Sequence, residues 1–254
     1  MTENSITDLN NLAEALGEDW RQGKQLYFRG QSQDWPLIPS LGRRYRGISF
    51  YDIEKRLFDE FKKEYVQHHG HPKEHWPVPD CASFDWDWVF AAIAQHHGLP
   101  TRLLDWSTNV EKALLFCVVS DGDQDRGSDG VLYGFRDRTA IALKSGVPCL
   151  THEGSPFRIH NVRPFSARGH GLNVDRIKAQ EGVFTFQPDP TTDLIAELEL
   201  GKDPRQKWRK WRIPRGAKTK LLGQLEEKQI SLAMMFPGID GLCRHVCRTV
   251  FGIA

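Results

Sequence analysis

Hydrophobic positions recur along this chain at two spacings, one typical of helices and the other of strands. Apolar residues three or four apart predict amphipathic helices, and one nearly continuous apolar run predicts a buried helix. These helices are expected at residues 7–16, 51–66, 84–98, 110–119 and 219–231. Aromatic and β-branched residues predict strands at 24–31, 101–108, 130–135, 180–186 and 208–214. Gly17 and Gly98 are expected to end the first and third helices.

The richest group of polar side chains lies in the extended segment 101–108 and just before it. It comprises His96, His97, Thr101, Arg102, Asp105, Trp106, Ser107 and Thr108. Burying an unpaired polar group costs roughly 1–3 kcal/mol, so a purely structural segment seldom contains so many. Side chains alternate along a strand, which places Asp105 and Ser107 on one face and Trp106 and Thr108 on the other. We interpret the segment as part of a site, with a buried hydrogen-bond network as the alternative.

Composition limits the class of protein. The 254 residues can form a sizeable core, and 39% hydrophobic with 26% charged residues is usual for a globular protein. A net charge of +1 argues against a globally basic nucleic-acid binder. Five cysteines without a CxxC pair fit a reducing compartment better than a disulfide framework. No signal peptide is visible, and the longest apolar run, 113–119, is too short to span a bilayer, so a soluble cytoplasmic protein without membrane association is expected.

Three other groups of residues suggest chemistry but have simpler interpretations. Four histidines between 68 and 75 suggest a metal, yet they lie on no regular element, so a solvated loop is favoured and no metal site is predicted. The basic segment 202–220, which contains Trp208 and Trp211, could bind a nucleic-acid backbone or form a strand with solvated charges. Arg158, Arg163 and Arg168 lie in a loop that could meet an anion. The two cysteines of CRHVC, 243–247, are expected in the core.

Four blocks in this order resemble the FRG domain family, named after a Phe/Tyr-Arg-Gly motif. They are YFRGQ at 27–31, AQHHGLPTRLLDWSTNVEKAL at 94–114, RIKAQEGVFTF at 176–186, and WRIP with LLGQLEEKQIS and MFPGIDGL within 211–242. The second block is long and therefore specific. The resemblance implies an FRG domain at 24–254, preceded by an N-terminal helix and lead-in at 1–23. No P-loop, GxGxxG, GxSxG or HExxH motif is present.

The order of the FRG blocks is remotely similar to the three-part site of ADP-ribosyltransferases. Those enzymes place an Arg or His on a first strand, a Ser-Thr-Ser or Tyr motif on a second strand leading into a helix, and a Glu on a later strand. The resemblance implies one α+β domain with a mixed or antiparallel split sheet flanked by helices. The catalytic positions that it implies are Arg29, Ser107, Thr108, and Gln180 with Glu181, of which only one can face a given cleft. The cofactor-binding positions are Tyr27, Arg29, Gly30, Gln31, His97, Thr101, Arg102, Asp105 and Trp106.

The implied activity is an NAD-dependent ADP-ribosyltransferase with NAD as substrate. Cleavage of the nicotinamide–ribose bond creates an oxocarbenium-like cation, for which Glu181 is a stabilising carboxylate and Asp105 a substitute if Gln180 faces the cleft instead. Arg29 suits the pyrophosphate, although a buried Arg29–Asp105 pair would be an equally ordinary structural feature. The resemblance further implies a bacterial toxin of anti-phage defence with a macromolecular acceptor and a neutralising antitoxin protein. The basic segment after 202 and the arginines at 158–168 favour RNA or another nucleic acid slightly over a protein as the acceptor.

Two other functions compete with the transferase. The first is a non-enzymatic module of a toxin or defence system that binds a nucleotide or partner in the same cleft. The second, a metal-dependent nuclease, is weaker, because acidic clusters with metal-ligand spacing are missing. His96 and His97, at a helix C-terminus, have a structural interpretation beside the functional one, as does Trp106, which suits a core.

Overall fold

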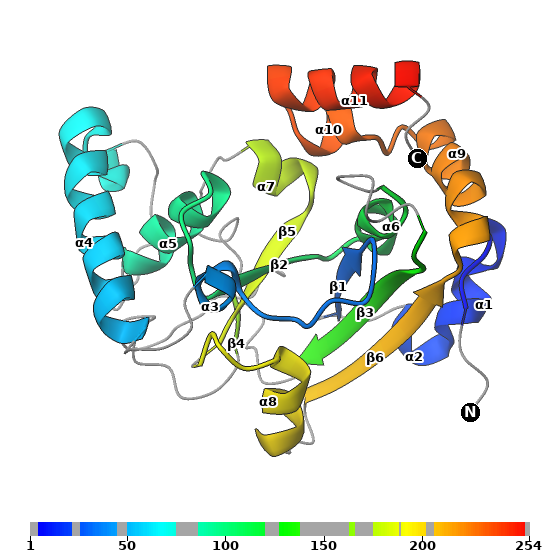
Figure 1. The fold of residues 1–254 in the computed structure, drawn as a ribbon, viewed down its shortest axis with the longest axis horizontal. Coiled ribbons are helices and arrows are strands. Elements are labelled where there is room, and N and C mark those ends of the chain that lie inside the picture. Colours follow the sequence, from blue (N-terminus) through cyan, green and yellow to red (C-terminus); the bar gives the residue numbers. More distant parts are fainter. Residues whose placement is uncertain are drawn as a thin grey trace.

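Helices surround one six-stranded antiparallel sheet in the computed structural model (Figure 1). The model describes residues 5–21, 26–44, 50–74, 86–119, 127–137, 163–165, 175–187, 189–201 and 206–251. The strands are β1 (Leu26–Gln31), β2 (Leu103–Ser107), β3 (Gly130–Asp137), β4 (Arg163–Phe165), β5 (Gly182–Phe186) and β6 (Gln206–Ile213). Their order is β4-β5-β2-β1-β3-β6, and every neighbouring pair is antiparallel. The predicted α+β class with an antiparallel sheet is confirmed.

The helices follow the predicted pattern closely. They are α1 (Leu12–Leu16), α2 (Glu18–Arg21), α3 (Ser40–Arg44), α4 (Phe50–His69), α5 (Asp87–His96), α6 (Val110–Val118), α7 (Asp175–Ala179), α8 (Leu194–Gly201), α9 (Lys218–Glu227), α10 (Leu232–Met235) and α11 (Ile239–Phe251). Short 3-10 turns cover Leu9–Asn11, Pro72–Glu74 and Arg215–Ala217. Gly17 and Gly98 end their helices with positive φ, as predicted. The Asn109 side chain caps α6 by accepting from the Glu111 and Lys112 amides.

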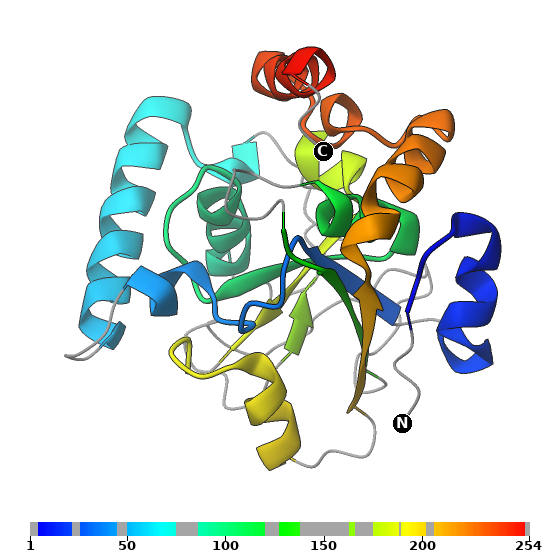
Figure 2. The ribbon, with the colours of Figure 1, turned by 45° about the vertical axis from the view of Figure 1, so that its right-hand side comes forward.

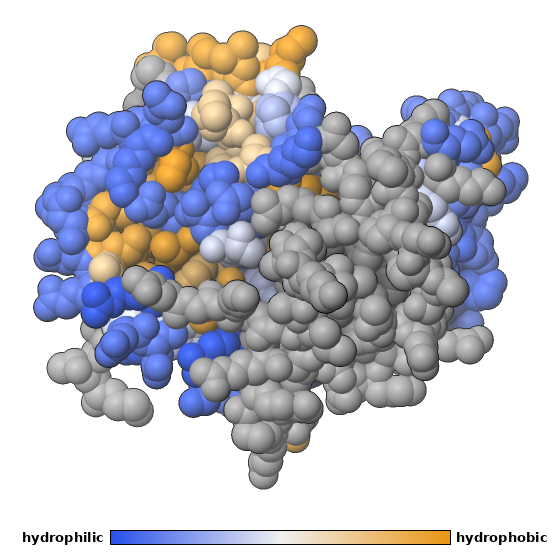
Figure 3. Space-filling model, turned by 180° about the vertical axis from the view of Figure 1, so that it is seen from behind, coloured by the Kyte–Doolittle hydropathy of each residue, from blue (hydrophilic) through white to orange (hydrophobic). Residues whose placement is uncertain are grey.

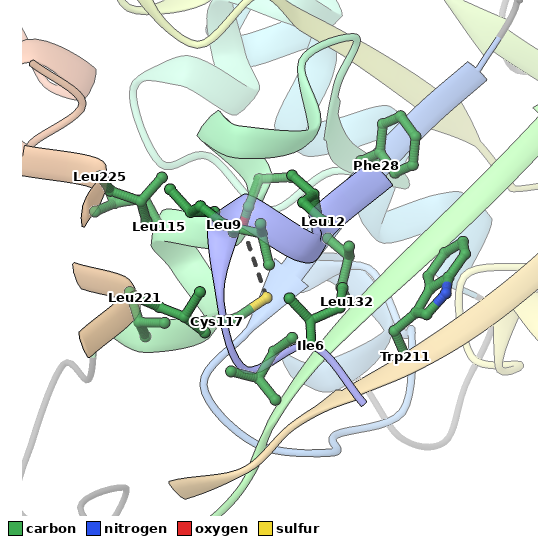
Figure 4. Close-up of a cluster of buried hydrophobic side chains, with 14 of the residues drawn as sticks. Ile6, Leu9, Leu12, Phe28, Leu115, Cys117, Leu132, Trp211, Leu221 and Leu225 are labelled. Atoms are coloured by element: carbon green, nitrogen blue, oxygen red, sulfur yellow. Dashed lines mark hydrogen bonds between the residues drawn. The ribbon is translucent and has the colours of Figure 1, made fainter. Parts of the chain in front are cut away.

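Three clusters of buried side chains hold the layers together. The largest joins α1, α2, α6 and α9 to one face of β1, β3 and β6, and Phe28, Leu132 and Trp211 are the members that Figure 4 labels on these three strands. The second packs α4, α5 and α7 against β2 and β5. On the opposite face of the sheet, α8 covers a third cluster that includes Tyr27 and Trp106. The sheet face opposite α8 is therefore covered by two separate groups of helices. These groups lie on opposite sides of the β1–β2 junction (Figure 2).

The N-terminal segment is part of the main core. Ile6, Leu9, Leu12, Leu16 and Trp20 are buried in the same cluster as α6 and α9. Ser5 also forms a parallel bridge with Arg212 of β6, which extends the sheet edge. Residues 5–21 and the later helices thus share one hydrophobic core.

The C-terminal helix α11 presents an apolar face to solvent, which Figure 3 shows as a band along the top of the molecule. Ile239, Leu242, Val246 and Val250 of this helix are exposed. Cys243 and Cys247 are exposed as well, so the prediction that the CRHVC cysteines lie in the core is wrong. The sequence of this segment does not show whether another element covers the cysteines.

No helix among the described residues is both long enough and apolar enough to cross a bilayer.

Candidate functional site

The sheet opens between its two central strands. β1 and β2 are paired only at Phe28 and Ser107, whereas β1 pairs with β3 along its whole length and β2 pairs with β5 along its own. From Arg29 onward, β1 therefore leaves β2 without a backbone partner on that side. Buried backbone groups need partners, so side chains must satisfy this part of β2.

Arg29 fills the opening. Its Nη1 donates to the Asp105 carbonyl at 2.6 Å and lies 3.8 Å from the Asp105 carboxylate. The Arg29 side chain is 19% exposed, while that of Asp105 is half exposed. Burial lowers the pKa of Arg29, an effect that Asp105 offsets. Because a guanidinium stays protonated in proteins, Arg29 carries a fixed positive charge at the opening. Its buried Nε has no hydrogen-bond partner among the described residues.

A small network holds the Asp105 carboxylate in place. The Gln95 amide, at the end of α5, donates to both carboxylate oxygens at 3.1 and 3.3 Å. The Gln95 carbonyl accepts from Thr101 Oγ1 at 2.5 Å, and the same hydroxyl accepts from the Leu103 amide. Thr101 thus acts through Gln95 and lies outside the opening itself. The network orients Asp105 beside Arg29.

The choice between Gln180 and Glu181 is made by the backbone. These residues form a turn before β5 rather than its first two positions, and Glu181 has a positive φ of 48°. Gln180 lines the opening, and its Nε2 donates to the Met235 carbonyl at 3.0 Å. Glu181 points toward α6, where its carboxylate lies 3.0 Å from Lys112 Nζ and accepts from Asn109. The amide, not the carboxylate, therefore faces Arg29.

Ser107 and Thr108 fasten that turn to the end of β2. Ser107 Oγ donates to the Gln180 carbonyl at 2.7 Å and accepts from the Asn109 amide at 3.0 Å. The exposed Thr108 bonds Glu181 through its amide at 3.1 Å and its hydroxyl at 3.4 Å. Ser107 is buried and lines the opening, but its hydroxyl already donates one hydrogen bond and accepts another. It positions Gln180.

Two cavities meet at Arg29. The smaller, about 160 Å³, contains the polar residues of the opening; it is lined by Phe28, Arg29, Gly30, Asp105, Trp106, Ser107, Ala113, Phe116, Arg176 and Gln180. The larger, about 570 Å³, extends toward α3 and α10; it is lined by Arg29, Gly30, Gln31, Ser32, Trp35, Pro36, Ile38, Arg43, Phe116, Val119, Leu232 and Phe236. Arg29, Gly30 and Phe116 belong to both, so together they form one groove.

The groove is predominantly cationic. Arg176 lies over the Phe236 ring at 4.5 Å, and Arg43 is exposed on α3. Although the residue as a whole is exposed, partial burial of its guanidinium lowers the pKa of Arg43, and Asp105 acts in the opposite direction. Burial, with His97 and Arg176 nearby, lowers the pKa of His96 to about 4, so this imidazole is neutral near pH 7. Three guanidiniums against one carboxylate suit a ligand with more than one negative charge.

The remaining predicted residues have structural surroundings. Arg102 is fully buried and binds Glu54 of α4 through two nitrogens. Tyr27 is buried on the opposite face of the sheet, and so is Trp106, whose indole donates to Thr185 Oγ1 at 2.9 Å. His97 is exposed at the end of α5 and packs edge-on against His96. Trp106 also lines the smaller cavity, whereas Arg102, Tyr27 and His97 line neither cavity.

Gly30 and Gln31 contribute to the groove indirectly. A Cβ on Gly30 would lie 2.0 Å from the Ala113 carbonyl and 2.8 Å from Cys117 Sγ, so only glycine lets α6 cross β1 this closely. The Gln31 amide donates to the Trp35 carbonyl at 2.7 Å.

The sequence did not indicate four residues of the groove, namely Trp35, Arg43, Arg176 and Phe236, or Gln95, which holds Asp105. One signal was available: Arg176 precedes Gln180 by four residues, which is one helical turn. Trp35 and Arg43 lie in a Pro- and Gly-rich segment without periodicity, so only the tertiary structure brings them to the groove.

The basic segment 202–220 is mainly structural where it is described. Trp211 is buried with its indole bonded to the Ala15 carbonyl, and Lys218 is buried against the Ser32 carbonyl. Lys210 and Arg212 pair with Asp34 and Asp129. The strand interpretation is confirmed, although these charges are paired rather than freely solvated. The loop with Arg158 and Arg168 lies outside the described residues, as does His75. Among residues that are described, no three or more His, Cys, Asp or Glu side chains gather as a metal site.

Fold and groove define an α+β protein whose antiparallel sheet opens at its centre around a buried arginine. The family model of the FRG domain matches residues 24–126, which supports an FRG domain in this segment. The match contains both central strands, with Arg29 and Asp105. No curated protein matches the chain, and no solved structure does.

Proposed function

We propose that the protein is an NAD-dependent ADP-ribosyltransferase that modifies a macromolecule. The observation that carries the proposal is the meeting of three positions in one cavity: Arg29 on β1, Ser107 at the end of β2 before α6, and Gln180 directly before β5. β5, β2 and β1 are neighbours in the sheet, which is nearly divided between β2 and β1. The order of these three positions along the chain is similar to that of the three-part transferase site, and this similarity supports the proposal.

The groups in the groove can be matched to the steps of the reaction. Arg29, supported by Arg43, binds the diphosphate, because guanidiniums pair with phosphate oxygens in a bidentate manner. The smaller cavity receives the nicotinamide ring, and the Gln180 amide bonds a hydroxyl of the attached ribose. As the C1′–N1 bond breaks, the nicotinamide nitrogen keeps the electron pair and the sugar becomes oxocarbenium-like. The half-exposed Asp105 carboxylate stabilises that positive charge until the acceptor nucleophile attacks C1′.

The acceptor is either RNA or a protein. The basic sequence of β6 favours RNA as the acceptor. In the structure, however, Arg209, Lys210 and Arg212 of this strand form structural contacts. The described residues therefore give neither acceptor an advantage. By resemblance to its family, we propose a toxin of anti-phage defence that is neutralised by an antitoxin protein.

Nicotinamide release provides the test. The purified protein is incubated with NAD and a cell lysate, nicotinamide is quantified, and acceptors are screened by mass for one added ADP-ribose. We expect release that depends on the lysate. Asp105→Asn keeps the shape of the side chain but removes its charge, so we expect a loss of about 10²-fold or more in rate. Absence of both release and modified acceptor would reject the activity.

One observation favours a second function, a non-enzymatic nucleotide-binding module. The third position presents the Gln180 amide, and Glu181 is engaged with Lys112. The remaining carboxylate, Asp105, already interacts with Arg29 and Gln95. A groove of this kind can bind a dinucleotide and leave its glycosidic bond intact. Binding of NAD by calorimetry without nicotinamide release would support this function over the transferase.

A further inference from the structure

The loop that follows β1 holds an exposed tryptophan in a rigid frame. Trp35 is 44% exposed, although an indole is among the largest apolar groups. Around it, the Gln31 amide bonds the Trp35 carbonyl at 2.7 Å, and Asp34 accepts from Tyr133 Oη at 2.7 Å and pairs with Lys210. The Leu37 amide donates to Asp193 at 2.7 Å. The backbone is thus fixed on both sides of Trp35, while its ring remains open to the groove.

The walls of the larger cavity combine flat apolar surfaces with positive charge. Trp35, Pro36 and Ile38 form one side, and Leu232 of α10 and Phe236, the residue directly after α10, are among the residues that complete it. Arg43 lies on the rim, where its Nη1 donates to the Ile38 carbonyl at 2.5 Å. Arg29 stands at the junction with the smaller cavity. An aromatic platform beside guanidiniums is the combination that binds a nucleobase with its phosphate.

We propose that the larger cavity is a subsite for an adenine mononucleotide, in which Trp35 stacks on the base and Arg43 with Arg29 binds the phosphates. The proposal rests on the proposed function in one respect: the mononucleotide is the adenosine half of NAD. Size assigns the halves, since the 570 Å³ cavity accommodates the bulkier adenosine and the 160 Å³ cavity the smaller nicotinamide ring. The shared Arg29 then meets the diphosphate that joins them.

Calorimetry with fragments of the dinucleotide tests this subsite. Wild-type protein is titrated with ADP-ribose, AMP and nicotinamide mononucleotide. Trp35→Ala is expected to weaken binding of ADP-ribose and AMP by about tenfold, because stacking of one base on an aromatic ring is lost. Nicotinamide mononucleotide is expected to bind this variant as it binds wild type. Trp35→Phe restores a ring and is expected to recover most of the affinity.

Two matched controls separate the subsite from general effects. Trp208 on β6 is similarly exposed but lies outside both cavities, so Trp208→Ala should bind AMP like wild type. Arg44 is the exposed neighbour of Arg43 and lines neither cavity, so Arg44→Ala should leave AMP binding unchanged, whereas Arg43→Ala weakens it. Far-ultraviolet circular dichroism of each variant shows that the fold is retained.

The outcomes distinguish this proposal from the transferase. If AMP binds through Trp35 and Arg43 but NAD yields no nicotinamide, the result supports the adenine subsite and rejects the transferase activity. If nicotinamide is released with the same kcat/KM by wild type and Trp35→Ala, the activity stands and the subsite is rejected. Failure of AMP to bind where ADP-ribose does, or equal weakening of AMP and nicotinamide mononucleotide by Trp35→Ala, also rejects it.

Discussion

Gly30 shows how one residue can be fixed by the element that crosses it. Because a Cβ here would collide with the Ala113 carbonyl, Gly30→Ala is expected to lower the free energy of unfolding by about 3 kcal/mol, or to prevent folding. Gly223 provides the control: it is an exposed position of α9, and a Cβ there meets nothing within 4 Å. Gly223→Ala should stabilise the protein by about 0.5–1 kcal/mol. Urea unfolding measures both, and a neutral Gly30→Ala would contradict the close crossing.

His96 links the groove to the pH dependence of stability. Its pKa falls from 6.5 to about 4 on folding, chiefly through burial and then through His97 and Arg176, with Asp105 acting in the opposite direction. Below about pH 6.5 the unfolded chain therefore takes up a proton that the folded protein does not, so stability decreases as the pH falls toward about 4.

The variant His96→Gln isolates this contribution. It is expected to lose less stability than wild type between about pH 7 and about pH 5, by up to about 2 kcal/mol. Unfolding curves at both pH values measure the difference, and exposed His68→Gln serves as the control. Identical pH dependence of wild type and His96→Gln would show that His96 is not buried as described.

Among the elements, α4 is tied to the sheet by a buried ion pair. Glu54 of α4 binds Arg102, and the guanidinium also lies about 5 Å from the rings of Tyr51 and Phe186. Glu54→Ala leaves a buried charge without its partner and is expected to cost about 3–5 kcal/mol in unfolding free energy. The double variant Glu54→Leu/Arg102→Met should regain most of that loss. A cost below about 1 kcal/mol for Glu54→Ala would argue against the pair.

The accessibility of α11 can be tested through its thiols. Cys243 and Cys247 are exposed, whereas Cys117 is a buried residue of α6, and burial raises the pKa of its thiol to about 12. Since the thiolate is the reactive form, maleimide should label Cys243 and Cys247 in the native protein and Cys117 only after denaturation. Peptide mapping by mass spectrometry identifies the labelled sites. Protection of both α11 cysteines would mean that this face is covered.

At the scale of the whole molecule, the N-terminal segment is expected to be essential for folding. Removing residues 1–21 deletes five side chains from the main core, among them Leu16 and Trp20. Loss of a single large core side chain costs about 2–5 kcal/mol, while a whole domain is stable by only about 5–15 kcal/mol. The truncated chain should therefore lose cooperative thermal unfolding, as measured by calorimetry. Cooperative unfolding of the truncated chain would instead support an independent lead-in at 1–23.

The sequence by itself determined the elements and much of the candidate site. Periodicity located the principal helices and strands, and the YFRGQ and LLDWS segments indicated Arg29 and Asp105. These features follow from local chemistry: side-chain alternation, capping and glycine ends act within a few residues.

Only the tertiary structure decided which side chains meet. Gln180 rather than Glu181 faces Arg29 because Glu181 adopts a positive φ and is drawn to Lys112, sixty-nine positions away in the sequence. Arg102, indistinguishable from a ligand-binding arginine in sequence, is engaged by Glu54 of a distant helix. Trp35 lines a cavity only because the fold places Leu232 of α10 at the same cavity. Such contacts join residues far apart in the chain, and no local pattern encodes them.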